Sequence, residues 1–564
     1  METDPKRGAR EDRRRITPVV AGFAVLLVVV VAGVVFWANQ QPRNPVTLKV
    51  LAGSELADVM GDDDLMRDLE AATGITLEPT YVGTLQGADD IVNGGGRCET
   101  GSDAHCDLAW FSSNDYMELL WDEKQALAEA ADEPWVTQSG ETMRSPVVLG
   151  VKTSAAQRLG WTQDRAVSWN EIADRAAEGS LSFFMTDPAT SNSGFSALVG
   201  VASGFDRNGD DLNLEDVDPA RAGDLFSGLV RTAGSSQWLT EQFVADQDEA
   251  DAIVNYESEL IVLADSGAIA EDLVIVYPER TVYADYPVQL LAADQQDAYD
   301  DLVEWLRDAG TQEDISEVTH RRPATDSGVP DDDSVPSMDP VPVPLPEELN
   351  TANGLIDDYL RDYRDPAHTI YLLDTSRSMS GAPMNQLRQA FGDLTGNDTS
   401  ITGEFARFRQ GERVTILPYD TAPGRPAQFT LADPEQDLEE LSPLRDHVSG
   451  LVPDGGRTAI YAALEEAYAL VERSQAEGEG YYTSIVLITD GENNDPSLGL
   501  DAFGADFSAA SSGSLGTPTF IVMLGDDDRY VQEMESVADL TGGRVFDAAQ
   551  TSIRAAFKEI RGYQ

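Results

Sequence analysis

The stretch YLLDTSRSMSG, residues 371–381, places an apolar run directly before one aspartate and two serines. The run predicts a buried strand, because it is continuously apolar and is followed by residues that favour turns. Asp374, Ser376 and Ser378 follow at alternate positions, so their oxygen atoms can gather at the carboxyl end of that strand. What these oxygens hold depends on which other side chains reach the same edge of the sheet.

The surrounding residues, 365–564, alternate between strand-like and helix-like patterns. Strands are predicted at HTIYLLD (368–374), SIVLITDGE (484–492) and PTFIVMLGD (518–526), a hairpin at ERVTILPYDT and AQFTLAD (412–421 and 427–433), and a long amphipathic helix at 458–478. This alternation is typical of one doubly wound α/β domain with a parallel sheet, and its length of about 200 residues is ordinary.

Polar residues recur at the predicted strand ends of this region. In a parallel sheet these ends share one edge, so five oxygen-bearing side chains are expected to converge there. Such a set suits a hard divalent cation, because Mg²⁺ takes oxygen ligands and only one or two carboxylates. The predicted metal ligands are Asp374, Ser376, Ser378, Thr458 and Asp490.

The D-x-S-x-S…T…D pattern resembles that of the von Willebrand factor A (VWA) domain over residues 365–564. The resemblance implies a Rossmann-like, doubly wound fold and a metal-ion-dependent adhesion site (MIDAS). It also implies Mg²⁺, or Mn²⁺ or Ca²⁺, with one coordination position open to a carboxylate of a protein or glycan partner. The alternative is that Asp374 and the serines only cap a helix while Asp490 begins a turn.

Two arginines depart from the most familiar form of this pattern. Arg377 stands inside the D-x-S-x-S motif, and Arg457 directly precedes Thr458. One interpretation is that both are exposed and pair with the acidic surface. The other is that they flank the metal and attract an incoming carboxylate.

Residues 46–323 also alternate between strands and amphipathic helices, and short polar turns follow the strands. The ordered segments VLAGSELADVM, ATGITLEPTYVGT, CDLAWFSSNDY, TDPATSNSGFSAL and IVNYESELI resemble a type II extracellular solute-binding protein. The resemblance implies two α/β lobes joined by a hinge, with a small-molecule solute held between them. Asp187, Glu257 and Glu259 near the presumed cleft disfavour an anionic solute.

Carried onto this sequence, the resemblance points to hydroxyl groups at strand ends as ligands of the solute. Ordinary helix capping is the alternative for each of them, because Ser and Thr are preferred at helix N-termini. The candidate solute-binding residues are Ser54, Thr84, Ser113, Ser193 and Tyr256.

The N-terminus carries a long uncharged segment, residues 17–38, preceded by a basic tail, residues 1–16. About 20 helical residues cross the hydrocarbon of a bilayer. Basic residues before the segment keep that end cytoplasmic, so the sequence predicts a single-pass anchor in the cell membrane with the bulk of the chain outside. A cleaved signal peptide is the alternative, although Phe36-Trp37-Ala38 makes a poor cleavage site.

Cys98 and Cys106 lie close together in a polar, glycine-rich loop. Outside the cell such a pair predicts a disulfide, and a metal site with His105 and Asp107 is the alternative. A weaker pattern, FDRNGDDLNLEDVD, begins like a calcium loop with Asp206, Asn208 and Asp210 but lacks the expected Gly and Glu. A solvated acidic turn is the alternative to Ca²⁺ there.

The formal net charge of −61 excludes nucleic acid as a partner, because so acidic a surface repels phosphates. Residues 324–364 are rich in proline and aspartate and then form a short helix, so we expect an extended connector between the two domains. Four histidines stand apart from any catalytic motif, so the sequence does not predict an enzyme.

The combination predicts a cell-surface binding or adhesion protein, in which the second domain binds a partner through a metal and the first senses or holds a solute. The alternative is a solute receptor accessory to an ABC-type importer, with the second domain as a docking module. An assembly factor that contacts another membrane protein is a third possibility.

Overall fold

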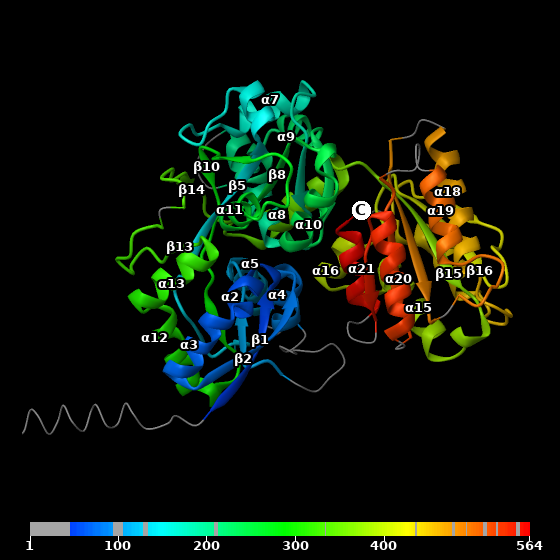
Figure 1. Cartoon of the computed structure of the whole chain (residues 1–564), viewed down its shortest axis with the longest axis horizontal. Helices are drawn as coiled ribbons and strands as arrows, with labels where there is room; N and C mark the ends of the chain where they lie inside the picture. The colour runs from blue at the N-terminus through cyan, green and yellow to red at the C-terminus, as the bar shows by residue number, and fades with distance from the viewer. Residues whose placement is uncertain are drawn as a thin grey trace, which may run out of the picture.

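The computed structural model describes residues 45–93, 105–127, 133–207, 212–332, 334–434, 437–476, 480–491, 493–510, 516–525, 528–548 and 553–563. The predicted cytoplasmic tail and membrane anchor, residues 1–38, lie outside these ranges. Within them, no helix has both the length and the apolar character needed to cross a bilayer. Figure 1 shows two α/β lobes and a third α/β body that carries the C-terminus.

The first lobe contains a five-stranded sheet in the order β2-β1-β3-β12-β4, in which β1 runs parallel to β2 and β3. Its strands are β1 (Val46–Gly53), β2 (Ile75–Val82), β3 (Leu108–Trp110), β4 (Thr137–Gln138) and β12 (Val288–Leu290). Its helices are α2 (Ala57–Gly61), α3 (Asp63–Thr73), α4 (Thr84–Val92), α5 (Asp115–Ala126) and α12 (Gln296–Leu306). The parallel strands with following helices confirm the predicted α/β pattern.

The second lobe contains a sheet in the order β11-β5-β8-β6-β7, with β9 and β13 also paired to β5. Its strands are β5 (Met143–Lys152), β6 (Phe183–Thr186), β7 (Leu229–Ala233), β8 (Ala252–Tyr256), β9 (Leu273–Val276), β10 (Arg280–Thr281), β11 (Tyr283–Ala284) and β13 (Arg322–Pro323). The helices of this half are α6 (Thr153–Leu159), α7 (Trp169–Ala177), α8 (Asn192–Phe205), α9 (Pro219–Phe226), α10 (Ser236–Ala245), α11 (Glu257–Asp265) and α13 (Ala309–Thr319). The chain passes from the first lobe to the second after β4, returns after β11, and crosses again between α12 and β13, so three crossovers join the lobes within the described ranges.

The proline-rich segment within residues 324–364 packs against the second lobe. It has little regular structure, as expected, but Val341 and Pro342 form β14, which pairs with β10. Arg322 binds Asp331 at 3.0 Å and ties the segment to the second lobe. The expectation of an extended connector is therefore wrong in this respect, because charged and apolar side chains fasten the segment to the first domain.

Helix α14 (Leu349–Asp358) and the π-helical turn Tyr359–Tyr363 follow this segment and join the two lobes. Tyr116 of the first lobe donates a 2.8 Å hydrogen bond to Asn353, and the ring of Phe226 in the second lobe packs on Tyr359 with centroids 5.1 Å apart. The helix thus belongs to the core of the first domain rather than to a flexible tether.

The C-terminal domain is built on a six-stranded sheet in the order β17-β16-β15-β18-β19-β20. All pairs are parallel except β16 and β17, which form the predicted hairpin. The strands are β15 (Ala367–Asp374), β16 (Arg413–Tyr419), β17 (Ala427–Thr430), β18 (Tyr482–Thr489), β19 (Thr519–Met523) and β20 (Val545–Asp547). The doubly wound parallel sheet is therefore confirmed.

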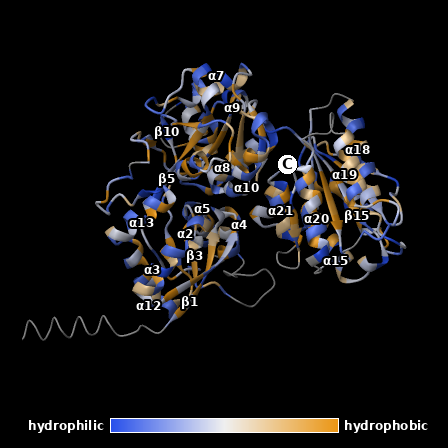
Figure 2. Cartoon of the chain, viewed as in Figure 1, coloured by the Kyte–Doolittle hydropathy of each residue, from blue (hydrophilic) through white to orange (hydrophobic). Residues whose placement is uncertain are grey.

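Helices cover both faces of this sheet, and a separate apolar core lies under each layer. They are α15 (Ala382–Gly392), α16 (Ile401–Ala406), α17 (Ser442–Ser449), α18 (Ile460–Ala476), α19 (Leu500–Ala510), α20 (Asp528–Thr541) and α21 (Ile553–Arg561). Figure 2 shows hydrophobic residues concentrated on the strands, with hydrophilic residues on the outer surfaces of the helices.

The two domains share one apolar core across their contact. The ring of Trp238 in α10 lies against Tyr563, with centroids 3.5 Å apart, and near Phe520 of β19, at 6.1 Å. Buried residues of the second lobe and of the C-terminal domain form a single cluster through this contact. Figure 1 shows α16 and α21 facing the two lobes.

Candidate functional site

Asp374 and Asp490 lie at the carboxyl ends of the neighbouring strands β15 and β18. Asp374 is fully buried and accepts hydrogen bonds from the backbone N–H of Ser376 at 2.7 Å and from the hydroxyl of Thr489 at 2.8 Å. Burial raises the pKa of Asp374 above its ordinary value, and the hydrogen bonds from Ser376 oppose that rise. A buried carboxylate without a cationic partner is costly, so this position favours a positive charge nearby.

Hydrogen bonds connect the two serine hydroxyls to the second carboxylate. Ser376 Oγ and Ser378 Oγ lie 2.9 Å apart, and Ser378 Oγ donates to Asp490 Oδ1 at 2.9 Å. Burial also raises the pKa of Asp490, while the hydrogen bond from Ser378 lowers it. Four of the five predicted metal ligands therefore form one continuous cluster of oxygen atoms.

Thr458 belongs to a loop that is fastened to this cluster by backbone contacts. Gly455 N donates to the carbonyl of Thr375 at 3.1 Å, and Thr458 N donates to Asn494 Oδ1 at 2.8 Å. Thr458 is buried, but its side chain makes no hydrogen bond to the other four ligands in the described part of the chain. The loop that carries Thr458 therefore lies beside the cluster, and a cation bound there could be coordinated by the Thr458 hydroxyl.

The sequence analysis missed three residues that shape this edge. Asp420 follows β16, and its carboxylate lies so near Gly455 that a Cβ there would be 2.6 Å from Oδ2. Thr489 holds Asp374, and Asn493 accepts from the backbone N–H of Ile460 at 3.1 Å. The position of Asp420 directly after a predicted strand was the available signal.

The donor set fits a hard cation better than a soft one. It consists of two carboxylates and three hydroxyls, with no sulfur or imidazole among the predicted ligands. No group of three or more His, Cys, Asp or Glu side chains in the described ranges is arranged to hold a metal, so a cation here depends on the hydroxyls. Arg377, Ser378 and Arg457 are exposed beside the cluster, so it is open to solvent on one side.

The predicted solute-binding residues are not brought together in one open cleft. Asn192 Nδ2, in the second lobe, donates to Ser112 Oγ of the first lobe and to Tyr256 Oη, both at 3.1 Å. These bonds close the lobes directly onto each other around Tyr256, which is fully buried. Ser112 and Asn192 were not predicted, although both occur in the polar turns that the sequence analysis singled out.

The other candidates have internal roles. Ser193 Oγ lies 2.7 Å from both Thr186 Oγ1 and Ser236 Oγ, within the second lobe. Ser113 Oγ accepts from the backbone N–H of Asp115 at 3.2 Å, but Ser113 lies one residue before Asn114, the N-cap of α5, whose side chain makes no capping hydrogen bond among the described residues. Thr84 is buried at the start of α4.

A buried ion cluster also joins the closed lobes. Arg321 is fully buried and binds Asp58 of the first lobe at 2.6 Å and Glu259 of the second at 3.5 Å. It also donates to the backbone carbonyl of Glu55 at 2.5 Å. Burial, followed by the charge of Asp58, raises the pKa of Glu259 to about 8. Arg321 thus forms an ion pair with one carboxylate from each lobe.

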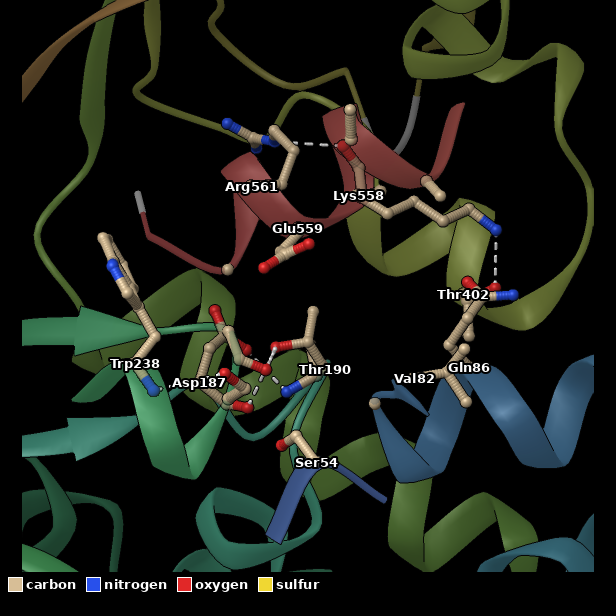
Figure 3. Close-up of a pocket in the computed structure, with 18 of the residues that line it drawn as sticks. Ser54, Val82, Gln86, Asp187, Thr190, Trp238, Thr402, Lys558, Glu559 and Arg561 are labelled. Atoms are coloured by element: carbon tan, nitrogen blue, oxygen red, sulfur yellow. Dashed lines mark hydrogen bonds between the residues drawn. The ribbon is translucent and has the colours of Figure 1, made fainter. Parts of the chain in front are cut away.

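A cavity of about 440 Å³ lies beside this closed contact, where both lobes face the C-terminal domain (Figure 3). Ser54 is the one predicted solute-binding residue that lines it. Its other walls include Asp187 and Thr190 from the second lobe and Thr402 and Lys558 from the C-terminal domain. A volume of this size is typical of small-molecule sites.

Two other predicted features fall partly outside the described residues. Cys98 lies outside them and Cys106 is buried within them, so the disulfide remains a prediction. Asn208 and Asp210 also lie outside them, whereas Asp206 is described, so the calcium loop remains untested.

Two family models match the chain. Residues 48–315 match the family described as bacterial extracellular solute-binding protein, and residues 370–558 match the von Willebrand factor type A domain. No curated protein matches the sequence.

Several solved structures are similar over 56% of this chain. They include a periplasmic thiamin binding protein (12% identity, 95% of that chain, TM-score 0.42), a ferric binding protein from Campylobacter jejuni (15%, 100%, 0.39) and AfuA from Actinobacillus pleuropneumoniae with exogenous fructose-6-phosphate bound (13%, 98%, 0.41).

Proposed function

We propose that this chain, an extracellular solute-binding domain followed by a VWA domain, is a binding receptor at the cell surface. Its VWA domain captures an acidic protein or glycan partner through a divalent cation, and its solute-binding domain holds a small molecule. Anchoring by residues 17–38 and a disulfide between Cys98 and Cys106 are parts of this proposal. Catalysis is not part of it.

The observation that supports the metal-dependent half is the oxygen cluster from Asp374 through Ser376 and Ser378 to Asp490. A bound Mg²⁺ or similar ion would supply a positive charge that a partner's carboxylate can share. Asp374 would bind the ion from the buried side of the site, because its carboxylate is buried and already accepts a hydrogen bond from Thr489. The exposed Ser378 would mark the side from which the partner approaches.

The backbone around the cluster limits its movement, which favours a preformed site. Ser376 and Gly455 pair as an isolated β-bridge, and Asn494 N donates to the carbonyl of Thr458 at 3.0 Å. Three loops that follow different elements are therefore joined before any cation binds. A preformed site loses less entropy on binding than a flexible one.

The deciding experiment is capture of partners from a cell-surface extract by the immobilised full-length chain, with Mg²⁺ or with a chelator. We expect capture in Mg²⁺ that disappears with chelator and in the Asp374→Ala variant. Asp501→Asn, at an exposed position on α19, is the control and should capture normally. Capture that is insensitive to chelator and to Asp374→Ala would contradict the proposal.

The cavity supports a second candidate function, a solute receptor accessory to an importer with the VWA domain as its docking module. It predicts that a small molecule copurifies with the chain and that the captured partner is a permease. Mass spectrometry of the captured proteins distinguishes this from adhesion to a glycan or a surface protein.

A further inference from the structure

The cavity between the lobes and the VWA domain has walls from three bodies, as Figure 3 shows. The first lobe contributes Gln86 and Asp90, the second contributes Asp187, Thr190 and Trp238, and the VWA domain contributes Thr402, Phe405, Ala555, Lys558 and Glu559. A molecule held here would touch both domains at once.

The VWA wall is fixed to the second lobe by close packing. A Cβ on Gly562 would lie 2.8 Å from Thr190 Oγ1, and a Cβ on Gly234 would lie 3.3 Å from Glu559 Cγ. The backbones can approach this closely only because both positions are glycine. Together with the contact between Trp238 and Tyr563, these close approaches pack α21 against the second lobe, so α21 forms one wall of the cavity.

The contact between the VWA domain and the first lobe includes a chain of polar side chains. Thr402 Oγ1 donates to Asp89 Oδ2 at 2.9 Å, and Lys558 Nζ donates to Thr402 Oγ1 at 2.7 Å. Phe405 of α16 also belongs to the apolar core of the first domain. A molecule in the cavity would add contacts with both domains.

The cations that line the cavity are already matched by carboxylates. Lys558 pairs with Asp398 at 3.2 Å, and Arg544 pairs with Glu559 at 2.8 Å. The remaining two, Arg364 and Arg561, share Glu412 at 3.0 and 2.6 Å, and Arg364 also pairs with Asp187 at 3.8 Å. None of them has a full positive charge left for an anionic ligand.

Two lining carboxylates lack such a match. Asp90 and Glu241 form no ion pair within the described residues, and each accepts one side-chain hydrogen bond, from Gln86 at 2.9 Å and from Gln237 at 3.1 Å. Burial, and then repulsion from Asp89, raises the pKa of Asp90 to about 6. The nearby charges of Lys558 and Arg554 lower this pKa and offset the rise only in part, so the first-lobe wall of the cavity still favours a cation.

The side-chain oxygen of Gln86 lacks a hydrogen-bond donor among the described residues. Its Nε2 is used by Asp90, whereas its Oε1 is buried and has no hydrogen-bond partner in the described structure. A buried acceptor without a partner costs free energy unless a ligand or water satisfies it. The acceptor lies beside the unpaired carboxylate but is covered in this structure, so an ammonium group bound at Asp90 would reach it only after the Gln86 side chain shifts.

We propose that this composite cavity is the solute site of the chain and that it binds a small organic molecule carrying an ammonium group. Asp90 accepts a hydrogen bond from the ammonium group, and Trp238 and Phe405 cover the hydrocarbon part of the ligand. The VWA domain completes the site through α16 and α21. This inference rests on the solute-holding half of the proposed function and names its ligand class.

The test is isothermal titration of the full-length chain with three probes of matched length: putrescine, butanediol and succinate. We expect putrescine to bind and the neutral and anionic probes not to bind. Asp90→Asn should weaken putrescine binding by about tenfold or more. Asp68→Asn, on the exposed surface of α3, should leave it unchanged.

Ala555→Phe tests the contribution of the VWA domain, because this α21 residue lines the cavity and the larger side chain fills it. It should abolish putrescine binding, whereas Ala71→Phe on exposed α3 should not. Absence of putrescine binding, or binding unaffected by Ala555→Phe, would overturn the inference. Thermal stabilisation by Mg²⁺, measured on the same samples, reports on the metal-dependent function separately.

Discussion

The hydroxyl of Ser378 donates a 2.9 Å hydrogen bond to the carboxylate of Asp490, which lies 112 residues further along the chain. The bond joins the loop after β15 to the loop after β18, and these strands are neighbours in the sheet. It brings a hydroxyl oxygen and a carboxylate oxygen within 2.9 Å of each other, close enough for one cation to bind both in place of the hydrogen bond. The contact therefore links the order of strands in the fold to the proposed chemistry of the VWA domain.

Asp374→Asn should change stability only when Mg²⁺ is present. Without metal we expect the variant to be about as stable as the parent, because Asn removes a buried charge whose pKa burial has raised. With Mg²⁺ at about 100 times its dissociation constant, the parent should gain about 2.7 kcal/mol and the variant should gain little. Thermal unfolding with and without Mg²⁺ measures both.

Asp501→Asn is the matched control for that comparison and should retain the full Mg²⁺ effect. If Asp374→Asn lost stability equally in the presence and absence of Mg²⁺, the residue would have a structural role only.

The double variant Arg377→Ala/Arg457→Ala should slow partner association without weakening Mg²⁺ binding. Both arginines are exposed beside the oxygen cluster, where they raise the local potential on a chain of net charge −61. We expect the association rate at low salt to fall several-fold and its salt dependence to flatten. Surface plasmon resonance with the partner captured in Mg²⁺ measures both, and an unaltered rate would mean that the arginines only pair with the acidic surface.

The two folds, and the gathering of four candidate ligands at one sheet edge, could be predicted from sequence because each depends on a local pattern. Apolar strands ending in Asp374 and Asp490 place these residues on one sheet edge wherever the strands are adjacent. Thr458 was predicted by the same logic, and its loop does lie at that edge.

The proposed solute site could not be predicted in the same way, because the cavity depends on how whole domains pack together. Ser193 and Ser113 look like ligands in sequence, but they bond to their own lobe. The packing of Trp238 on Tyr563 and the close approach at Gly562 leave no periodic signal in the sequence. The contribution of the VWA domain to the cavity appears only in three dimensions.

Trp238→Ala should uncouple the VWA domain from the solute-binding domain. The side chain is buried between α10 and β19, so its removal should cost about 3–5 kcal/mol and leave a cavity at the contact. We expect calorimetry to show two separated unfolding transitions in place of a coupled one. Trp135→Ala, in the first lobe, is the control and should lower stability without separating them.

Glu259→Gln should stabilise the closed lobes at alkaline pH. The folded-state pKa of Glu259 is raised to about 8, mainly by burial, from an ordinary value of 4.5. Folding therefore favours its protonated form, and this contribution is complete below about pH 4.5 and is lost as the pH rises through about 8. Gln mimics the protonated form, so the variant should be more stable by about 1–3 kcal/mol above that range.

Urea denaturation of parent and variant at a series of pH values measures this difference, which should vanish at low pH. Glu317→Gln, at an exposed position on α13, should show no such difference at any pH. A Glu259→Gln variant that is less stable than the parent at high pH would contradict this prediction. It would mean that the ion pair between Arg321 and Glu259, 3.5 Å apart, stabilises the protein by more than the burial of the charged carboxylate costs.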